Sequence, residues 1–210
     1  MADWVTISAL ATAGGTLVLA VATFSSVRSS NRSARVAERA LMAGLRPVLM
    51  PSHFNDPEVK VGFADNRWMK VPGGGGAAEV SAEAVYLAMS VRNVGNGIAI
   101  LDSWRFVPER VLDREAPPLE EFHRLTRDLY IPVGDVGFWQ GVFRDPGSDD
   151  FRAAADAIEA RRQVTVDVLY GDHEGGQRVI TRFSMTPREG GEGWLVSTGR
   201  HWNIDRDDPR

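Results

Sequence analysis

The sequence predicts a mainly β domain that follows one membrane-spanning helix, and three observations support this fold class. Residues 4–27 are 24 consecutive positions without a charged side chain. Five arginines then follow at helical spacing, and after Pro47 the pattern changes to short alternating apolar runs separated by turn residues. We therefore divide the chain into a transmembrane anchor (1–27), a juxtamembrane amphipathic helix (28–46), a β-sandwich domain (47–204) and a tail (205–210).

Composition indicates an ordinary folded protein whose charge is divided unevenly along the chain. The 210 residues are 43% hydrophobic and 25% charged, which is typical of globular domains. Residues 1–46 carry a net charge of +3, whereas residues 47–210 contain 19 basic and 26 acidic residues, a net charge of −7. No nucleic-acid partner is expected for so acidic a domain. The absence of cysteine excludes disulfides, thiolate nucleophiles and Cys-ligated zinc.

Residues 4–27 are long enough to cross a bilayer as a helix. At 1.5 Å per residue they would span roughly 36 Å, against a hydrocarbon core of about 30 Å. A cleaved signal peptide is the alternative, since Ala20-Val21-Ala22 resembles a processing site. We favour the uncleaved anchor because no basic residue precedes the apolar run, which is also longer than that of an ordinary signal peptide.

Charges on the two flanks predict the orientation of the anchor. Asp3 precedes the apolar run, whereas several arginines follow it. Because basic residues are retained on the cytoplasmic side, we expect a short N-terminus outside the plasma membrane and the C-terminal domain in the cytoplasm.

Small residues in the anchor offer a surface to a second helix. Ala11 and Gly15 have the spacing that lets two membrane helices approach closely, and Gly14 adds to this surface. We expect them to contact another copy of the chain or a membrane-protein partner. The alternative is that Ala and Gly are simply frequent in membrane helices.

The arginines that follow the anchor lie on one face of the predicted helix. At 100° per residue they fall within an arc of about 60°, opposite a stripe of Ala and Leu. In an upright helix, only two or three of them would lie within a Debye length of about 8 Å from the lipid headgroups. A solvated face is the alternative. The residues expected to contact membrane lipids or an acidic partner are Arg28, Arg32, Arg35 and Arg39.

The residues after the arginines predict an antiparallel sandwich, with an immunoglobulin-like topology as first choice. The clearest hairpin signal is Asn96-Gly97, which lies between two alternating runs and favours the positive φ of a tight turn. Residues 164–168 are expected to pair with residues 179–183.

One or two short helices are expected within the sandwich. The spacing of apolar residues predicts a helix over 148–162, and a helical turn is expected within 117–125. Residues 73–76 are all glycine, so we expect them to form a flexible loop.

The order of several motifs resembles that of a known group of proteins. These motifs are Arg46-Pro47-Val48, Arg92-Asn93-Val94-Gly95-Asn96-Gly97, Phe138-Trp139, Tyr170-Gly171-Asp172 and Arg200-His201-Trp202-Asn203. Together with the anchor they resemble uncharacterised actinobacterial single-pass membrane-anchored β-sandwich proteins. The resemblance implies the architecture and a bacterial plasma membrane, and it implies no activity.

Residues that could carry catalysis are sparse. The four histidines lack the spacing of a metal site, and no nucleophile or phosphate-binding motif occurs. Asp172-His173-Glu174 is the one local cluster of acid and base types, but such residues are expected in the turn predicted there. We therefore expect no cofactor, no metal and no catalytic residue.

Three tryptophans are candidates for a contact surface. Trp68, Trp139 and Trp202 lie in or beside predicted loops, and protein interfaces favour tryptophan. Packing in the core is the alternative for each of them.

Three functions fit these features. The first is a membrane-tethered interaction module, an accessory or scaffolding subunit of a membrane complex rather than an enzyme. The second is a lipid-binding or small-ligand-binding helper in envelope transport, which a cavity between the sheets would favour. The third is an enzyme whose site assembles from distant segments.

Overall fold

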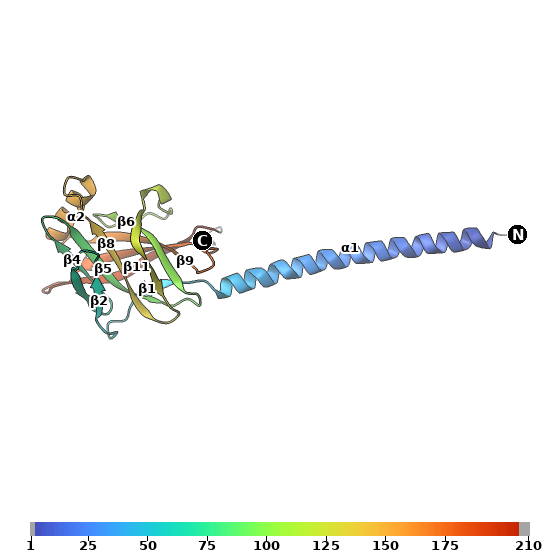
Figure 1. Ribbon diagram of the computed structural model, residues 1–210, viewed down its shortest axis with the longest axis horizontal. Helices are drawn as coiled ribbons and strands as arrows, with labels where there is room; N and C mark the ends of the chain where they lie inside the picture. Colours follow the sequence, from blue (N-terminus) through green and yellow to red (C-terminus); the bar gives the residue numbers. More distant parts are fainter. Residues whose placement is uncertain (1–2, 206–210) are drawn as a thin grey trace. The chain divides into compact units, whose positions relative to one another are not determined.

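The computed structural model describes residues 3–205, without the side chains of residues 5, 6 and 43, and these residues divide into two compact units. The unit up to Ala43 belongs to a single helix, α1 (Trp4–Gly44), which runs without a break from the apolar residues into the arginine-bearing segment (Figure 1). α1 is long and apolar enough to span a membrane. The continuity predicted between the anchor and the juxtamembrane helix is confirmed.

α1 ends two residues earlier than the sequence predicts. The expected helix extends to Arg46, whereas the last helical residue is Gly44. Pro47 disfavours helical geometry in the residue before it, and the Arg46 carbonyl instead accepts a hydrogen bond from the Asn96 N–H at 3.0 Å. The chain therefore leaves the helix because the β domain binds its backbone.

The second unit begins at Gly44 and is mostly antiparallel β-sheet. Its strands are β1 (Leu49–Pro51), β2 (Val59–Gly62), β3 (Trp68–Val71), β4 (Gly75–Val80), β5 (Val85–Asn93), β6 (Ala99–Val107), β7 (His123–Ile131), β8 (Val136–Phe143), β9 (Val164–Gly171), β10 (Val179–Pro187) and β11 (Trp194–Asn203). Nine of them form one sheet in the order β1-β5-β4-β11-β10-β9-β6-β7, with β8 also paired to β5. β2 and β3 form a separate two-stranded sheet.

The large sheet curves into a half-barrel (Figure 1). β4 and β1 pair with successive parts of one edge of β5, and β8 pairs with the opposite edge. The sheet therefore begins at β8 and ends at β7, two strands that are consecutive in the chain and contact each other. Within residues 3–205, however, β7 pairs only with β6 and β8 only with β5.

β5 is buried on both faces. Val85, Leu87 and Met89 face the main core inside the half-barrel. Tyr86 and Ala88 face the other way and pack with the β2–β3 sheet. Two layers of sheet therefore lie against each other at this strand.

α2 (Asp149–Glu159) packs on the main core next to β4 and β5. The Ser148 side chain caps it by accepting the Phe151 N–H, and acidic residues in the first turn favour its N-terminus. The predicted helix is confirmed, although it ends at Glu159. The helical turn expected nearby is also present as a short 3-10 helix, η1 (Leu119–Glu121).

The predicted hairpin at Asn96-Gly97 is wrong. β5 and β6 flank these residues but do not pair with each other, and neither residue has a positive φ. A Cβ atom at Gly97 would overlap the Leu45 carbonyl oxygen, and one at Gly95 would overlap that of Arg46. The glycines are thus needed for close approach of the chain that enters the domain, not for a tight turn.

Two further predictions have different outcomes. The pairing of residues 164–168 with 179–183 is confirmed, with Thr181 opposite Val168 and Phe183 opposite Val166. The glycine loop is only partly present, because Gly75 and Gly76 are the first residues of β4.

Candidate functional site

α1 exposes the described apolar side chains of its membrane-length run. Leu10, Leu17 and Phe24 are each about two-thirds exposed. Two hydroxyls within the run bond inside the helix, since Thr12 and Thr16 each donate to the carbonyl four residues earlier at 2.9 Å. The surface of this segment is therefore suited to an apolar environment such as lipid.

The small residues of the anchor lie on the open surface of α1. A Cβ atom added at Gly14 or Gly15 would meet no other described atom within 4 Å, and Ala11 is also exposed. This geometry leaves room for the backbone of another helix. Pairing through this ridge stays a prediction.

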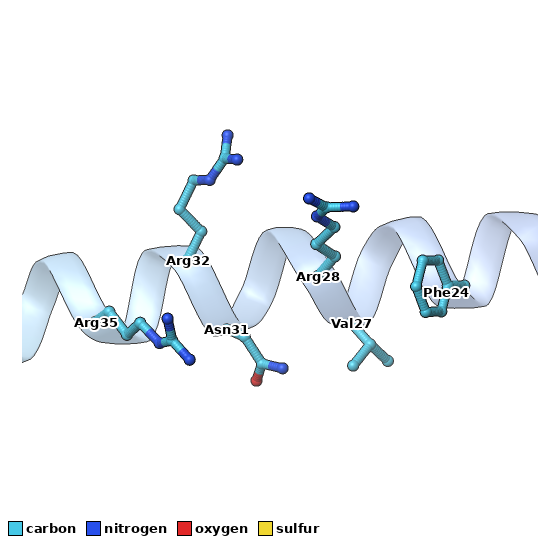
Figure 2. Close-up of a pocket in the computed structure, with 6 residues that line it drawn as sticks. All are labelled: Phe24, Val27, Arg28, Asn31, Arg32 and Arg35. Carbon is cyan, nitrogen blue, oxygen red and sulfur yellow. The ribbon is translucent and has the colours of Figure 1, made fainter.

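A groove lies on α1 where the apolar run gives way to arginines. It has a volume of about 460 Å³ and is lined by Phe24, Val27, Arg28, Asn31, Arg32 and Arg35. In Figure 2, Arg28 and Arg32 extend to the same side, and the Arg35 side chain runs along the helix toward Asn31. Guanidinium groups bind phosphate well, and the adjacent Phe24 is suited to the apolar part of a lipid.

These arginines are not neutralised within the described part of the chain. None of the ion pairs among residues 3–205 involves Arg28, Arg32 or Arg35. Arg39 is exposed one turn further along, outside the groove. Contact with headgroups or with an acidic partner stays a prediction for all four residues.

Asn93 holds the point where the chain enters the β domain. Its buried Nδ2 donates to the carbonyls of Gly97 at 2.6 Å and Ile131 at 3.0 Å. Its Oδ1 accepts the N–H groups of Gly95 at 3.0 Å and Val48 at 3.3 Å. One side chain therefore joins the entering segment to the loop between β5 and β6 and to the end of β7.

A second buried group holds β1. The Leu49 N–H donates to the Tyr170 hydroxyl at 3.0 Å, and this hydroxyl also bonds to the Thr181 Oγ1 at 2.8 Å. The Thr181 Oγ1 lies 2.7 Å from Nδ1 of His201. Burial raises the pKa of Tyr170 to about 12, because the phenolate would be desolvated. Tyr170 thus stays neutral over the physiological pH range.

The structure separates the three candidate tryptophans. Trp139 is completely buried and Trp202 is 4% exposed, so the prediction of a surface role for these two is wrong. Alternation along β8 directs Trp139 into the main core, where it contacts Trp104 at a ring distance of 5.3 Å. Trp68 is 67% exposed on β3, and it stays a candidate for a contact surface.

Sequence reasoning missed a buried ionic cluster on the other face of the sheet. Arg182 binds Asp167 with two hydrogen bonds of 2.7 and 3.0 Å, and Arg105 adds a third at 3.1 Å. The Trp202 ring lies 4.8 Å from the Arg182 guanidinium, and Glu121 pairs with Arg105 at 2.6 Å. Because Asp167 and Arg182 lie opposite each other on β9 and β10, the predicted strand pairing could have found them.

The acid–base cluster at residues 172–174 lies in a turn, as predicted. The buried Asp172 carboxylate accepts hydrogen bonds from the Gly176 N–H at 2.9 Å and from the Gln177 side chain at 3.2 Å. His173 is exposed and lies 3.6 Å from Glu174, which is longer than a hydrogen bond. Among the described residues, no group of three His, Asp or Glu side chains could hold a metal ion.

Comparisons with known proteins assign no family to this chain. No family model matches it, and neither a curated protein nor a solved structure matches it.

Proposed function

We propose that this chain is a membrane-tethered protein-interaction module, an accessory or scaffolding subunit of a bacterial membrane complex. One observation supports this proposal above all. The described apolar side chains of the α1 run are exposed, whereas the β domain forms a core of buried apolar side chains from its own residues. The segment that needs lipid or a partner is therefore the helix.

Each part of the molecule has a role in this proposal. The apolar run crosses the plasma membrane, and the ridge formed by Ala11, Gly14 and Gly15 packs against a partner helix. The arginines fix the cytoplasmic end, with a short N-terminus outside, and bind headgroups or an acidic partner. The β domain, for which we propose an immunoglobulin-like sandwich topology, presents the contact surface in the cytoplasm.

Co-purification of the full chain in mild detergent tests this function. A tagged copy is expressed with an untagged copy, and the proteins recovered with it are identified by mass. We expect a stoichiometric partner, either a membrane protein or the untagged copy. Substitution of Gly15→Ile should remove it, because the added side chain holds the second helix away.

Ala20→Ile is the matched control for this experiment. At 100° per residue, position 20 lies about 140° from position 15, so the same isoleucine side chain faces away from the ridge. Recovery should be unchanged in this variant. A chain that purifies alone with a bound small molecule would instead favour a ligand-binding helper. Equal loss of the partner in both variants would contradict pairing through the ridge.

A further inference from the structure

We infer that the seam between β7 and β8 binds an extended peptide segment of a partner protein, with a small apolar side chain seated in the cavity there. This inference rests on the proposed function, since it names the place on the β domain where a partner would bind. Three features of the seam support it: open strand edges, a small cavity and a buried polar group without a partner.

The first feature is the open strand edges. β7 and β8 contact each other at the two ends of the large sheet, yet no ladder of backbone hydrogen bonds joins them within residues 3–205. The pairing of β7 with β6 is also interrupted, because the register shifts between Leu129 and Arg124. An added strand satisfies open edges through its main chain, as in peptide recognition by strand addition.

The second feature is a cavity of about 100 Å³ at this interruption. Leu125 of β7 and Phe143 of β8 line it together with Trp104 of β6, and His123 and Thr126 are exposed at its rim. A protein cavity of about 150 Å³ holds benzene. The seam therefore fits a smaller group, such as the side chain of valine, and it is too small for a lipid chain or a drug-sized ligand.

The third feature is Gln140, which is one of the residues that line the cavity. Gln140 is 6% exposed, and its Oε1 is buried without a hydrogen-bond partner in the described part of the chain. A buried carbonyl without a hydrogen-bond partner lowers the stability of a fold. Its presence at Gln140 therefore indicates a role in binding and not in stability. A carboxamide is complementary to the amide of a peptide bond, which donates through N–H and accepts through C=O.

The amide and the strand edges favour a peptide over a small apolar molecule. An apolar molecule would fill the cavity but would leave Oε1 of Gln140 and the backbone groups of the edges unsatisfied. A peptide segment satisfies all three features at once, because each residue presents a side chain and two amide groups. The structure thus assigns the cavity to one side chain of an extended partner segment.

The test uses N-acetyl-valine-N-methylamide, the smallest probe with one valine side chain between two amides. It is titrated into the full chain in detergent micelles, and NMR follows the Gln140 side-chain amide and the Trp104 indole N–H. We expect saturable shifts of these two signals. N-acetyl-glycine-N-methylamide, which has the amides without the side chain, should produce much weaker shifts.

Gln140→Leu and Gln163→Leu are a matched pair of variants. Gln163 is half-buried in the loop before β9, outside the seam, so its substitution makes the same chemical change elsewhere. We expect Gln140→Leu to abolish the shifts while its melting temperature stays equal or rises, because a buried unsatisfied carbonyl is removed. Gln163→Leu should bind the probe like the wild type.

Three results would overturn the inference. They are probe shifts that do not saturate, shifts that persist in Gln140→Leu, and a markedly lower melting temperature for that variant, which would show a structural role for Gln140. The co-purification of the chain with its helix partner is measured independently. If the probe does not bind at the seam but the helix partner still co-purifies, only this inference fails and the proposed function is retained.

Discussion

α1 and the β domain differ in how far they bury the same kinds of side chain. Leu17 and Phe24 of α1 are about two-thirds exposed, whereas Leu87 and Phe183 of the domain are completely buried. The domain also pairs buried charges across its strands, as Asp167 does with Arg182. The domain therefore closes its own core, while the helix depends on surroundings that other molecules supply. Changes in one region should therefore leave the other region unaffected.

The largest effect is expected from charges in the middle of α1. The double substitution Leu17→Arg with Val21→Arg should raise the free energy of membrane insertion by roughly 5–7 kcal/mol, because a charge at the helix centre costs about 2.5–3.5 kcal/mol. Membrane flotation should show the chain in the soluble fraction, with the near-UV circular dichroism of the domain unchanged. Ser29→Arg with Ser33→Arg adds the same charge beyond the apolar run and should remain membrane-bound. Retention of the first variant in the membrane would contradict the dependence of α1 on lipid.

The reverse test removes a charge from the domain. Asp167→Asn leaves the buried Arg182 guanidinium without its counter-ion, so the free energy of unfolding should fall by about 3–5 kcal/mol. Urea unfolding measures this loss, and flotation should show an unchanged membrane fraction. Asp167→Leu with Arg182→Met removes both charges and should recover most of the stability. A single-variant loss below about 1 kcal/mol would show that the cluster is not desolvated.

A smaller loss is expected at Tyr170, together with a change in pH dependence. Tyr170→Phe leaves the Leu49 N–H without its acceptor, which should lower the free energy of unfolding by about 1–3 kcal/mol near neutral pH.

The pH dependence follows from the raised pKa of Tyr170. The folded state keeps its proton up to about pH 12, whereas an unfolded tyrosine loses it near pH 10. The wild type should therefore lose stability as the pH rises above 10, by up to roughly 2–3 kcal/mol at pH 12, and Tyr170→Phe should lack this component. The difference between their unfolding free energies, measured from pH 9 to 12, checks the sign. A difference that does not change with pH would show that the hydroxyl is accessible to water.

The smallest effect concerns the arginines nearest the membrane. In nanodiscs that contain anionic and zwitterionic phospholipids, Arg28→Gln should lower the preference of the full chain for the anionic lipid by about fivefold, and Arg32→Gln should act similarly. High salt should reduce the difference. Arg46→Gln is the control, since Arg46 lies beyond the end of α1, which is about 24 Å along the helix from Arg28 at 1.5 Å per residue. Equal effects at Arg28 and Arg46 would place the whole segment flat on the membrane.

Local patterns predicted those parts of the fold that depend on local composition. The uncharged run defines the apolar part of α1, and the alternating residues 164–168 and 179–183 are sufficient to predict the pairing of β9 with β10. Patterns failed where one residue type serves two purposes. The sequence around Gly97 is compatible both with a tight turn and with close approach of the Leu45 carbonyl. Only the tertiary structure distinguishes these two uses of glycine.

The candidate site was predictable only on the helix. The arginine groove follows from helical periodicity, because its residues are neighbours on one helix. The seam at Gln140 joins β6, β7 and β8, and a partnerless buried carbonyl cannot be recognised from the sequence around it. The burial of Trp139 likewise depends on which face of β8 meets the core.

Cysteine labelling compares the apolar part and the arginine-bearing part of α1 in a single experiment, because the chain has no cysteine of its own. Single substitutions Ala13→Cys, Ala20→Cys, Ser30→Cys and Ser33→Cys are treated with a membrane-impermeant maleimide, in intact cells and after the cells are opened. Positions 13 and 20 should stay unlabelled throughout, and positions 30 and 33 should react only in opened cells. Labelling of Ala20→Cys as fast as that of Ser33→Cys would show that α1 does not reside in lipid, and labelling of Ser30→Cys in intact cells would reverse its orientation.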